Sequence, residues 1–246
     1  MVRTIGQKVT NHFNSYGESY RSLRYYAYTP LLRFITDSKA AFNSKTLTSV
    51  MEIGCGGGVF LKKLSKDLPQ LEMLVGIDIS KALLKQFESL DYIEAILADA
   101  SFLPIREGSF DLSVTVSLLH HVVDTTPELS RKKALTTLRE LLRVSRSKGF
   151  VMINEEPVSR SRFISVATFW LTRLYSLMSS RAPIVNFLTP FDIQNLICDA
   201  IYSKRGLFVH SDCSIRRRRS GRYFLETLYY KIINFTYEIF FVLNKI

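Results

Sequence analysis

The sequence feature that most constrains the fold is the stretch Val50–Phe60, which reads VMEIGCGGGVF. An apolar run containing one acid, Glu52, leads into a glycine-rich turn, and an apolar segment with helical spacing follows. Glycine is used where the backbone takes a positive φ or approaches a ligand closely. The pattern therefore predicts a β-strand, a tight turn and the start of a helix, an arrangement typical of nucleotide-type binding sites.

Length and composition fit a globular protein. With 246 residues, 47% of them hydrophobic, the chain can bury a sizeable core. The three cysteines, Cys55, Cys198 and Cys213, have no metal-type spacing and cannot all pair, which indicates a reducing compartment. The N-terminus lacks the apolar core of a secretory signal, and no uncharged apolar run reaches the ~20 residues that cross a bilayer. We expect a cytoplasmic protein that touches the inner face of a membrane, if it touches one.

Predicted strands and helices alternate along most of the chain. Strands are expected at 49–53, 72–79, 92–98, 110–116, 150–155 and 207–215, with a closing strand near 236–246. Helices are expected at 59–68, 81–90, 127–144, 160–181 and 189–201, and a turn at 147–149. Such alternation predicts an α/β, doubly wound fold: a mostly parallel sheet with right-handed crossovers and helices on both faces.

Polar features stand at the carboxyl ends of four successive predicted strands: Glu52 with Gly54, Asp78, Asp99 and Ser117. Parallel sheets bind ligands beyond these ends. Asp78 can accept hydrogen bonds from both hydroxyls of a ribose, and Asp99 from an exocyclic amine such as that of adenine. Glu52 would repel a pyrophosphate but attract an amine or a sulfonium. The set favours a cationic nucleoside over a dinucleotide.

Simpler interpretations of the same residues stay open. The stretch 54–58 lacks the third glycine of a G-x-G-x-x-G fingerprint and the Lys-Ser/Thr of a phosphate-binding loop. Asp78 or Asp99 alone could cap the helix that follows its strand. Cys55 in such a turn is more often a small filler than a nucleophile. The acids Glu155 and Glu156 either line a pocket or end the fifth strand.

The resemblance to a known family rests on four motifs, which are VMEIGCGGG, LVGIDIS, ILADASFLPIREGSFDLSVTVSLLHHV and ELLRVSRSKGFVMINEEP. Together they resemble class I S-adenosylmethionine-dependent methyltransferases, in particular the small-molecule branch that includes ubiquinone- and menaquinone-biosynthesis enzymes. The resemblance covers roughly 48–156. It implies a Rossmann-like sheet of seven mostly parallel strands, a helical insertion after the fifth strand, and S-adenosyl-L-methionine as cofactor.

The resemblance also implies which residues hold the cofactor. The glycines of the turn would let the backbone approach the methionine part, and Glu52 would lie near its amino group. Asp78 would bind the ribose, Asp99 would read the adenine edge, and Ser117 would lie near the transferred methyl. The expected cofactor-binding set is Glu52, Gly54, Cys55, Gly56, Gly58, Asp78, Ile79, Asp99, Ala100 and Ser117.

A histidine pair follows the fourth predicted strand on the presumed substrate side. His120, the candidate base, or His121 could deprotonate a hydroxyl before methyl transfer. The alternative is a structural loop residue, because in-line transfer depends mainly on positioning. No metal site is expected.

Four segments are expected in one domain: an N-terminal helical cap at 1–47, a cofactor-binding core at 48–156, a helical insertion at 157–188, and a C-terminal part at 189–246 with a basic and apolar insertion near 216–235. In the resembling family the substrate is held by parts outside the sheet. Here the cap and the insertion are aromatic and apolar, so the acceptor is expected to be a hydrophobic or lipid-linked small molecule.

Three readings of the partners remain. The stretch 160–181 has Ser and Thr along one side, apolar residues along the other, and arginines at its flanks, which suits an anionic membrane surface. Alternatively, these helices pack on the domain or on a second subunit. The net charge of +11 and the run RRRR also favour an RNA methyltransferase. Against RNA, no appended RNA-binding module and no N/D-P-P-Y-type motif is found. For the function, a non-catalytic cofactor-binding protein is a further alternative.

Overall fold

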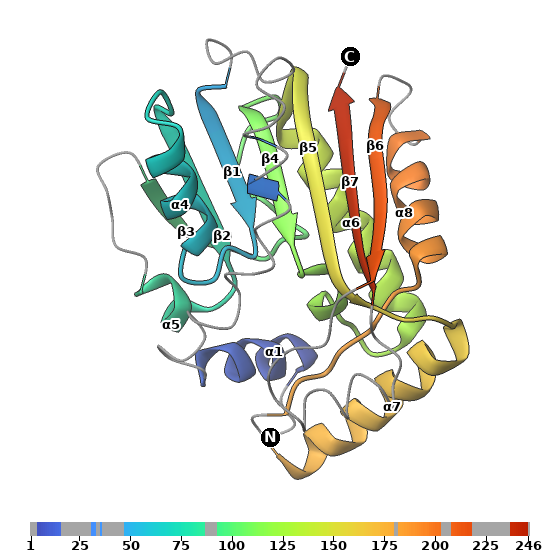
Figure 1. Cartoon of the computed structure of the whole chain (residues 1–246). Coiled ribbons are helices and arrows are strands. Elements are labelled where there is room, and N and C mark those ends of the chain that lie inside the picture. Colours follow the sequence, from blue (N-terminus) through green and yellow to red (C-terminus); the bar gives the residue numbers. More distant parts are fainter. Residues whose placement is uncertain are drawn as a thin grey trace.

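The computed structural model describes residues 4–15, 31–32, 35, 47–86, 93–179, 182–202, 208–217 and 237–245 (Figure 1). Seven strands form one sheet in the order β3-β2-β1-β4-β5-β7-β6. Their bounds are β1 Ser49–Ile53, β2 Met73–Asp78, β3 Ile93–Leu97, β4 Phe110–Val116, β5 Ser145–Val158, β6 Phe208–Arg217 and β7 Tyr237–Lys245. Neighbours among β1 to β5 are parallel, whereas β7 is antiparallel to both β5 and β6. The predicted α/β fold with a mainly parallel sheet is confirmed.

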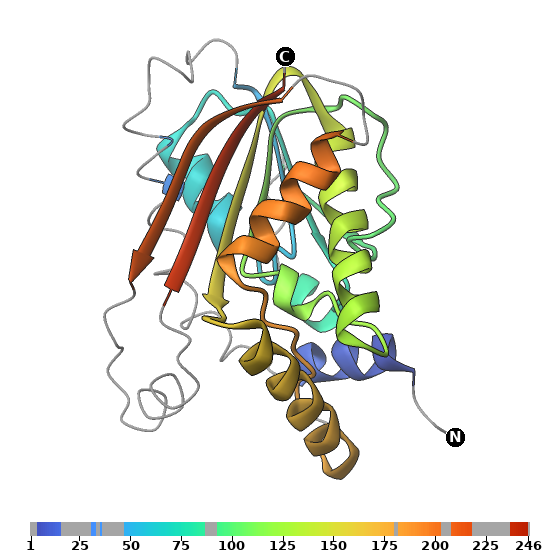
Figure 2. The same cartoon turned by 90° about the vertical axis from the view of Figure 1, so that its right-hand side faces the viewer.

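Helices cover both faces of the sheet (Figure 2). On one face lies α4 (Val59–Asp67), and on the other lie α6 (Pro127–Val144) and α8 (Pro190–Tyr202). Alternate residues of a strand point to opposite faces. Accordingly Val50 joins the core under α4, while Met51 and Ile53 join the core under α6 and α8. Burial on both faces explains why these strands read as nearly continuous apolar runs.

Most helices begin where the sequence signals a start. Thr126 caps α6 by accepting a hydrogen bond from the Leu129 N–H, and Pro127 takes the first helical position. Ser80 likewise caps α5 (Lys81–Leu84). The expected helix at 160–181 is α7 (Arg162–Met178), which follows β5. No helix among the described residues is long and apolar enough to span a bilayer.

The turn predicted at 147–149 is wrong, because these residues lie inside β5. The pairing of β4 with β5 shifts register between Phe110 and Leu112, as at a β-bulge. Lys148 takes a φ of 62°, and a Cβ on Gly149 would lie 2.9 Å from the Arg146 carbonyl oxygen. The glycine therefore marks an irregularity within a strand.

The first helix, α1 (Ile5–Asn14), lies within the N-terminal helical cap expected at 1–47, for which no bounds of individual helices were predicted. Thr4 and Gln7 form a reciprocal capping box at its start, with each side chain accepting from the other's backbone N–H. The T-x-x-Q pattern of a capping box is the sequence signal that predicts the start of a helix here. The tyrosine-rich segment at 16–30 lies outside the described residues.

Candidate functional site

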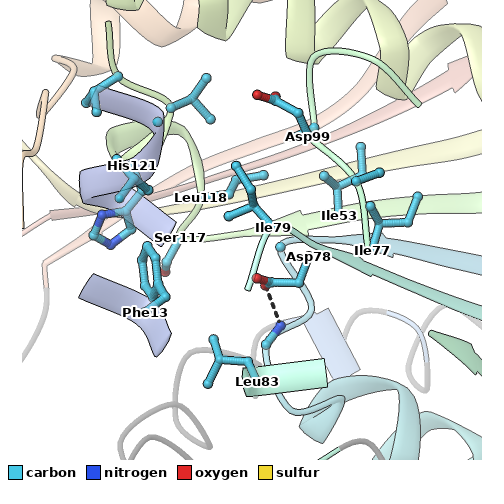
Figure 3. Close-up of a pocket in the computed structure, with 18 of the residues that line it drawn as sticks. Phe13, Ile53, Ile77, Asp78, Ile79, Leu83, Asp99, Ser117, Leu118 and His121 are labelled. Carbon is cyan, nitrogen blue, oxygen red and sulfur yellow. Dashed lines mark hydrogen bonds between the residues drawn. The ribbon is translucent and has the colours of Figure 1, made fainter. Parts of the chain in front are cut away.

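A pocket of about 700 Å³ opens at the carboxyl ends of the central strands. One wall comes from the ends of β1, β2 and β4, and α1 crosses the opening (Figures 1 and 3). Seven predicted cofactor-binding residues line this pocket: Gly54, Gly56, Asp78, Ile79, Asp99, Ala100 and Ser117.

The glycine turn after β1 has a backbone conformation that is unfavourable for residues with a Cβ. Gly54, Gly56 and Gly58 have φ values of 73°, 54° and 73°. The N–H groups of Gly54 and Cys55 both donate to the Ile77 carbonyl, at 2.7 and 3.1 Å, which ties the turn to β2. A Cβ on Gly54 would lie 2.9 Å from a methyl carbon of Leu118. Glycine is thus required at position 54 for both backbone conformation and space.

Asp78 ends β2 with its carboxylate held in place (Figure 3). Its Oδ2 accepts from the Gly56 N–H at 2.9 Å, and its Oδ1 accepts from the Ser80 N–H at 2.8 Å. A carboxylate offers about four acceptor sites, so capacity remains for a ligand's hydroxyls. Ser80, not Asp78, is the N-cap of α5, so the alternative in which Asp78 caps that helix is wrong.

Asp99 is paired with a lysine from the helix α6. Lys133 on α6 lines the pocket, and its Nζ lies 3.0 Å from Asp99 Oδ2. Burial raises the pKa of Asp99, but the hydrogen bond from the Ser101 N–H and the Lys133 ammonium outweigh it and hold this pKa below its ordinary value. Asp99 is thus an ionised carboxylate at the pocket wall.

Ser117 occupies a strained backbone position after β4. Its φ is 49°, although it is not a glycine, and its N–H donates to the Asn154 carbonyl at 2.7 Å. Strained residues of this kind concentrate at ligand sites. Ser117 is nearly buried and lines the pocket between the glycine turn and α1.

The other predicted site residues are not among those lining the pocket. Glu52 is fully buried within β1, and Gly58 is the N-cap of α4. The thiol of Cys55 is buried, and burial raises its pKa well above the ordinary value, with further contributions from the negative charges of Asp78 and Glu52. A thiol in this environment is a poor nucleophile, in line with its expected role as a filler.

His120 is turned into the protein rather than into the pocket. Its Nδ1 hydrogen-bonds to Oε1 of Glu155, and its ring stacks on Phe187 with centroids 5.3 Å apart. Glu155 is fully buried and also accepts from the N–H groups of Leu119 and His120, at 3.0 and 3.2 Å. This pair holds the short helix η3 (Leu119–His121) against the end of β5.

His121 lines the pocket instead, at its apolar end. Its ring meets Phe13 of α1 edge-on, with centroids 4.8 Å apart. Val9 of α1 and the pair Val122 and Val123 complete this wall. The pocket thus has two chemically different ends: carboxylates and glycines at one, and apolar side chains with one imidazole at the other. Lys133 was not predicted as a site residue, whereas His121 was named beside His120 as a possible base.

Known sequences match the central part of the chain. The family described as "Methyltransferase domain" matches residues 51–153. The tRNA (carboxymethyluridine(34)-5-O)-methyltransferase of Arabidopsis thaliana is 35% identical over 124 residues, which are 49% of this chain and 28% of that protein. The mitochondrial arginine-hydroxylase NDUFAF5 of Danio rerio is 30% identical over 82 residues, 33% of this chain and 25% of that protein. The chain thus spans less than a third of each of these two relatives.

Solved structures share the fold at low sequence identity. The complex of the Haloferax volcanii Trm112 methyltransferase activator with a putative methyltransferase contains a chain that is 12% identical, with a TM-score of 0.62 and coverage of 100% and 99% of the two chains. The N-methyltransferase NodS of Bradyrhizobium japonicum with bound S-adenosyl-L-homocysteine is 13% identical, with a TM-score of 0.53 and coverage of 87% and 85%. The [4+2]-cyclase SpnF, 14% identical, has a TM-score of 0.60 and coverage of 95% and 96%. A shared fold therefore does not by itself fix the reaction.

Proposed function

We propose, from the premise that the chain is a class I S-adenosylmethionine-dependent methyltransferase, that its methyl acceptor is a hydrophobic small molecule. The observation that carries this proposal is the apolar end of the pocket, formed by Val9, Phe13, Val122 and Val123. Such a wall excludes water and favours an acceptor with apolar surface. The narrower resemblance to quinone-biosynthesis enzymes stays a prediction.

The residues at the other end suit the cofactor S-adenosyl-L-methionine. When bound, this cofactor supplies a methyl group activated by a positively charged sulfonium. Asp78 and Asp99 bring two carboxylates to this end of the pocket, and the depressed pKa of Asp99 keeps its carboxylate ionised beside Lys133. The Gly54–Gly56 turn brings the backbone to the pocket wall, and Asp78 keeps acceptor capacity for ribose hydroxyls. We assign cofactor binding to these groups, with Ile79, Ala100 and Ser117 beside them.

On the acceptor side we assign the proton-accepting role to His121 in place of His120. His121 lines the pocket beside Phe13, whereas His120 is committed to the buried Glu155. An imidazole at the pocket wall can take a proton from an acceptor hydroxyl or amine. The role of His120 is then to position η3, and through it the neighbouring His121.

A second candidate function, methylation of RNA, is favoured by different observations. The net charge is +11, and tRNA methyltransferases of Arabidopsis thaliana and Xenopus tropicalis are among the relatives. A basic surface supplies the salt-dependent part of nucleic-acid affinity. The two candidates share the cofactor end of the pocket and differ only in the acceptor.

A methyl-transfer assay separates these candidates. The protein is incubated with cell extract and S-adenosylmethionine that carries a tritiated methyl group, and the label is counted in lipid, RNA and protein fractions. We expect the label in the lipid fraction. Label in the RNA fraction would establish the second candidate and contradict the first. Label in none of the fractions, together with retained cofactor binding, would support the non-catalytic reading.

Calorimetry with Asp78→Ala tests the cofactor end separately. The variant removes the carboxylate that holds Gly56 and faces the pocket, so affinity for S-adenosylmethionine should fall at least ~10-fold, about 1.4 kcal/mol. Asp67→Ala is the matched control, because Asp67 only pairs with Lys63 on the surface of α4. Equal affinities in the two variants would overturn the assignment of Asp78.

A further inference from the structure

The helix α7 has its apolar side chains on the outside. Seven large hydrophobic residues are exposed, with exposed fractions between 46% and 83%. We call this set the α7 outer face, and its members are Phe163, Trp170, Leu171, Leu174, Tyr175, Leu177 and Met178. Figure 2 shows α7 projecting beyond the sheet at the end where α1 lies. Contiguous exposed apolar patches of this kind mark interaction surfaces.

The inner side of α7 carries buried hydroxyls beside one buried aromatic residue, Phe169, and the hydroxyls are held by specific contacts. Ser165, Thr168 and Ser176 are buried. The Oγ1 of Thr172 donates to the Phe169 carbonyl at 3.0 Å and accepts from the Val185 N–H at 3.3 Å. Lys8 of α1 donates to both the carbonyl and the hydroxyl oxygen of Ser176, at 3.3 Å each. Surface helices normally bury the apolar side, so α7 is reversed, and these contacts fix it in the reversed orientation.

The segment that contains α7 carries a surplus of positive charge. Between Glu156 and Asp192 the sequence contains four arginines and no acidic residue. Arg160 and Arg162 are exposed at the start of the helix. Arg162 lies 3.5 Å from Glu128, but both side chains are mostly exposed, so this pair is weak. Exposed apolar side chains in a segment with a surplus of arginines match an anionic lipid surface, with acyl chains below and phosphates above.

We propose that the α7 outer face docks on the surface of an anionic membrane. Its apolar side chains enter the boundary between headgroups and acyl chains, and the arginines contact lipid phosphates. The docking itself needs no methyl transfer. Only one consequence rests on the proposed function, namely that a hydrophobic acceptor can enter the pocket from the bilayer.

The inner side of α7 connects this surface to the pocket wall. Phe169 is fully buried and packs in one cluster with Val123 and Ile184, against which Ile5 and Val9 of α1 are packed. Val9 and Val123 also line the apolar end of the pocket. A membrane bound to the outer face would therefore lie one helix away from the proposed acceptor end.

Trp170 makes the proposal directly measurable, because it is the chain's single tryptophan and belongs to the α7 outer face. The full-length protein is titrated with vesicles of phosphatidylglycerol and phosphatidylcholine, without cofactor or acceptor. We expect a blue shift of the tryptophan emission, quenching by brominated lipids, and loss of both at high salt. Vesicles of phosphatidylcholine alone should bind at least ~10-fold more weakly, since the ionic contribution is removed.

Variants at exposed positions separate docking from folding. Leu174→Gln with Leu177→Gln should weaken vesicle binding at least ~10-fold, whereas Tyr202→Gln, equally exposed on α8, should leave it unchanged. Arg160→Gln with Arg162→Gln should reduce the salt-sensitive part of vesicle binding. The charge-matched pair Lys63→Gln with Lys66→Gln on α4 should leave that part unchanged. Unchanged emission with anionic vesicles would overturn the proposal. So would a blue shift that needs no lipid and grows with protein concentration, which would assign the face to a second copy of the chain.

Discussion

At the scale of single residues, the site depends on positions where only one type of residue is tolerated. Gly54 is the clearest, since it combines a positive φ with a close approach to Leu118. Gly108 has a similar φ of 65°, but no atom lies within 4 Å of where its Cβ would be. The two glycines therefore separate the cost of backbone conformation from the cost of crowding.

Gly54→Ala and Gly108→Ala form a matched pair. A left-handed backbone costs a residue with a Cβ roughly 1–2 kcal/mol, so urea unfolding should show a loss of about that size in Gly108→Ala and a larger loss in Gly54→Ala, whose Cβ also meets Leu118. Gly54→Ala should in addition push Leu118 into the pocket and weaken S-adenosylmethionine binding in calorimetry. Gly108→Ala should bind like the wild type. Equal affinities in the two variants would mean that the Leu118 contact is relieved without entering the pocket.

The sequence predicts those site residues whose chemistry is tied to a strand end. Gly54, Asp78, Asp99 and Ser117 could be placed together because parallel strands bring their carboxyl ends to one edge. Lys133 could not, since helical spacing alone does not tell which of several charges on α6 reaches across to Asp99. The choice between His120 and His121 depends on the buried contact with Glu155, which lies 35 positions further along the chain.

At the scale of elements, Asp111 fastens the start of β1 to β4. Its Oδ2 accepts from the backbone N–H and the hydroxyl of both Thr48 and Ser49, at 2.8 to 3.1 Å. Its Oδ1 pairs with Arg146 at 2.8 Å. Burial raises the pKa of Asp111, but these hydrogen bonds, first among them that of the Thr48 N–H, outweigh it and hold this pKa below its ordinary value. The clamp therefore operates with an ionised carboxylate.

Asp111→Ala should lower the free energy of unfolding at pH 7 by about 1.5–3 kcal/mol, the worth of hydrogen bonds to a charged group. Because the folded-state pKa is depressed, the wild type holds this advantage above the ordinary carboxyl pKa and loses it as pH falls through the folded-state value. Urea unfolding at pH 7, 5 and 3 should show the two proteins converging only at the acid end. A gap that stays constant down to pH 3 would contradict the clamp.

Some elements were predicted to the residue. The helix α6 and the strand β4 are found with the predicted bounds. The strand β5 was predicted too short, because Gly149 looks like a turn residue until its close approach to the Phe110 and Asp111 carbonyls is known. The orientation of α7 also depends on tertiary contacts: its period is visible in the sequence, but the burial of the Ser/Thr side is not.

At the scale of the whole molecule, β7 is the last strand of the described sheet to appear along the chain. This strand follows β6 in the chain but lies between β5 and β6. Right-handed crossovers could be predicted for the strands that alternate with helices. No local pattern predicts that an antiparallel strand will enter between two others, because that depends on which edge is still unpaired.

Leu243→Pro tests how far the sheet depends on β7. Leu243 is buried in the core, and its backbone is paired with Val151 of β5 and His210 of β6. Proline removes a backbone donor from this interior strand as well as the leucine side chain. We expect loss of cooperative unfolding by near-ultraviolet circular dichroism. The control Leu243→Ala should still unfold cooperatively, destabilised by 2–5 kcal/mol. Similar behaviour of both variants would argue against an essential β7 ladder.

The strand order also bears on how the protein emerges from the ribosome. While residues up to 236 are being made, the outer edge of β5 has no strand to meet, and β6 has no sheet neighbour among the described strands. Unpaired edges are templates for association with other chains. The nascent chain is therefore exposed to misassembly in the interval between the synthesis of β5 and that of β7, when β1 to β5 are present and the strand that pairs with both β5 and β6 is not.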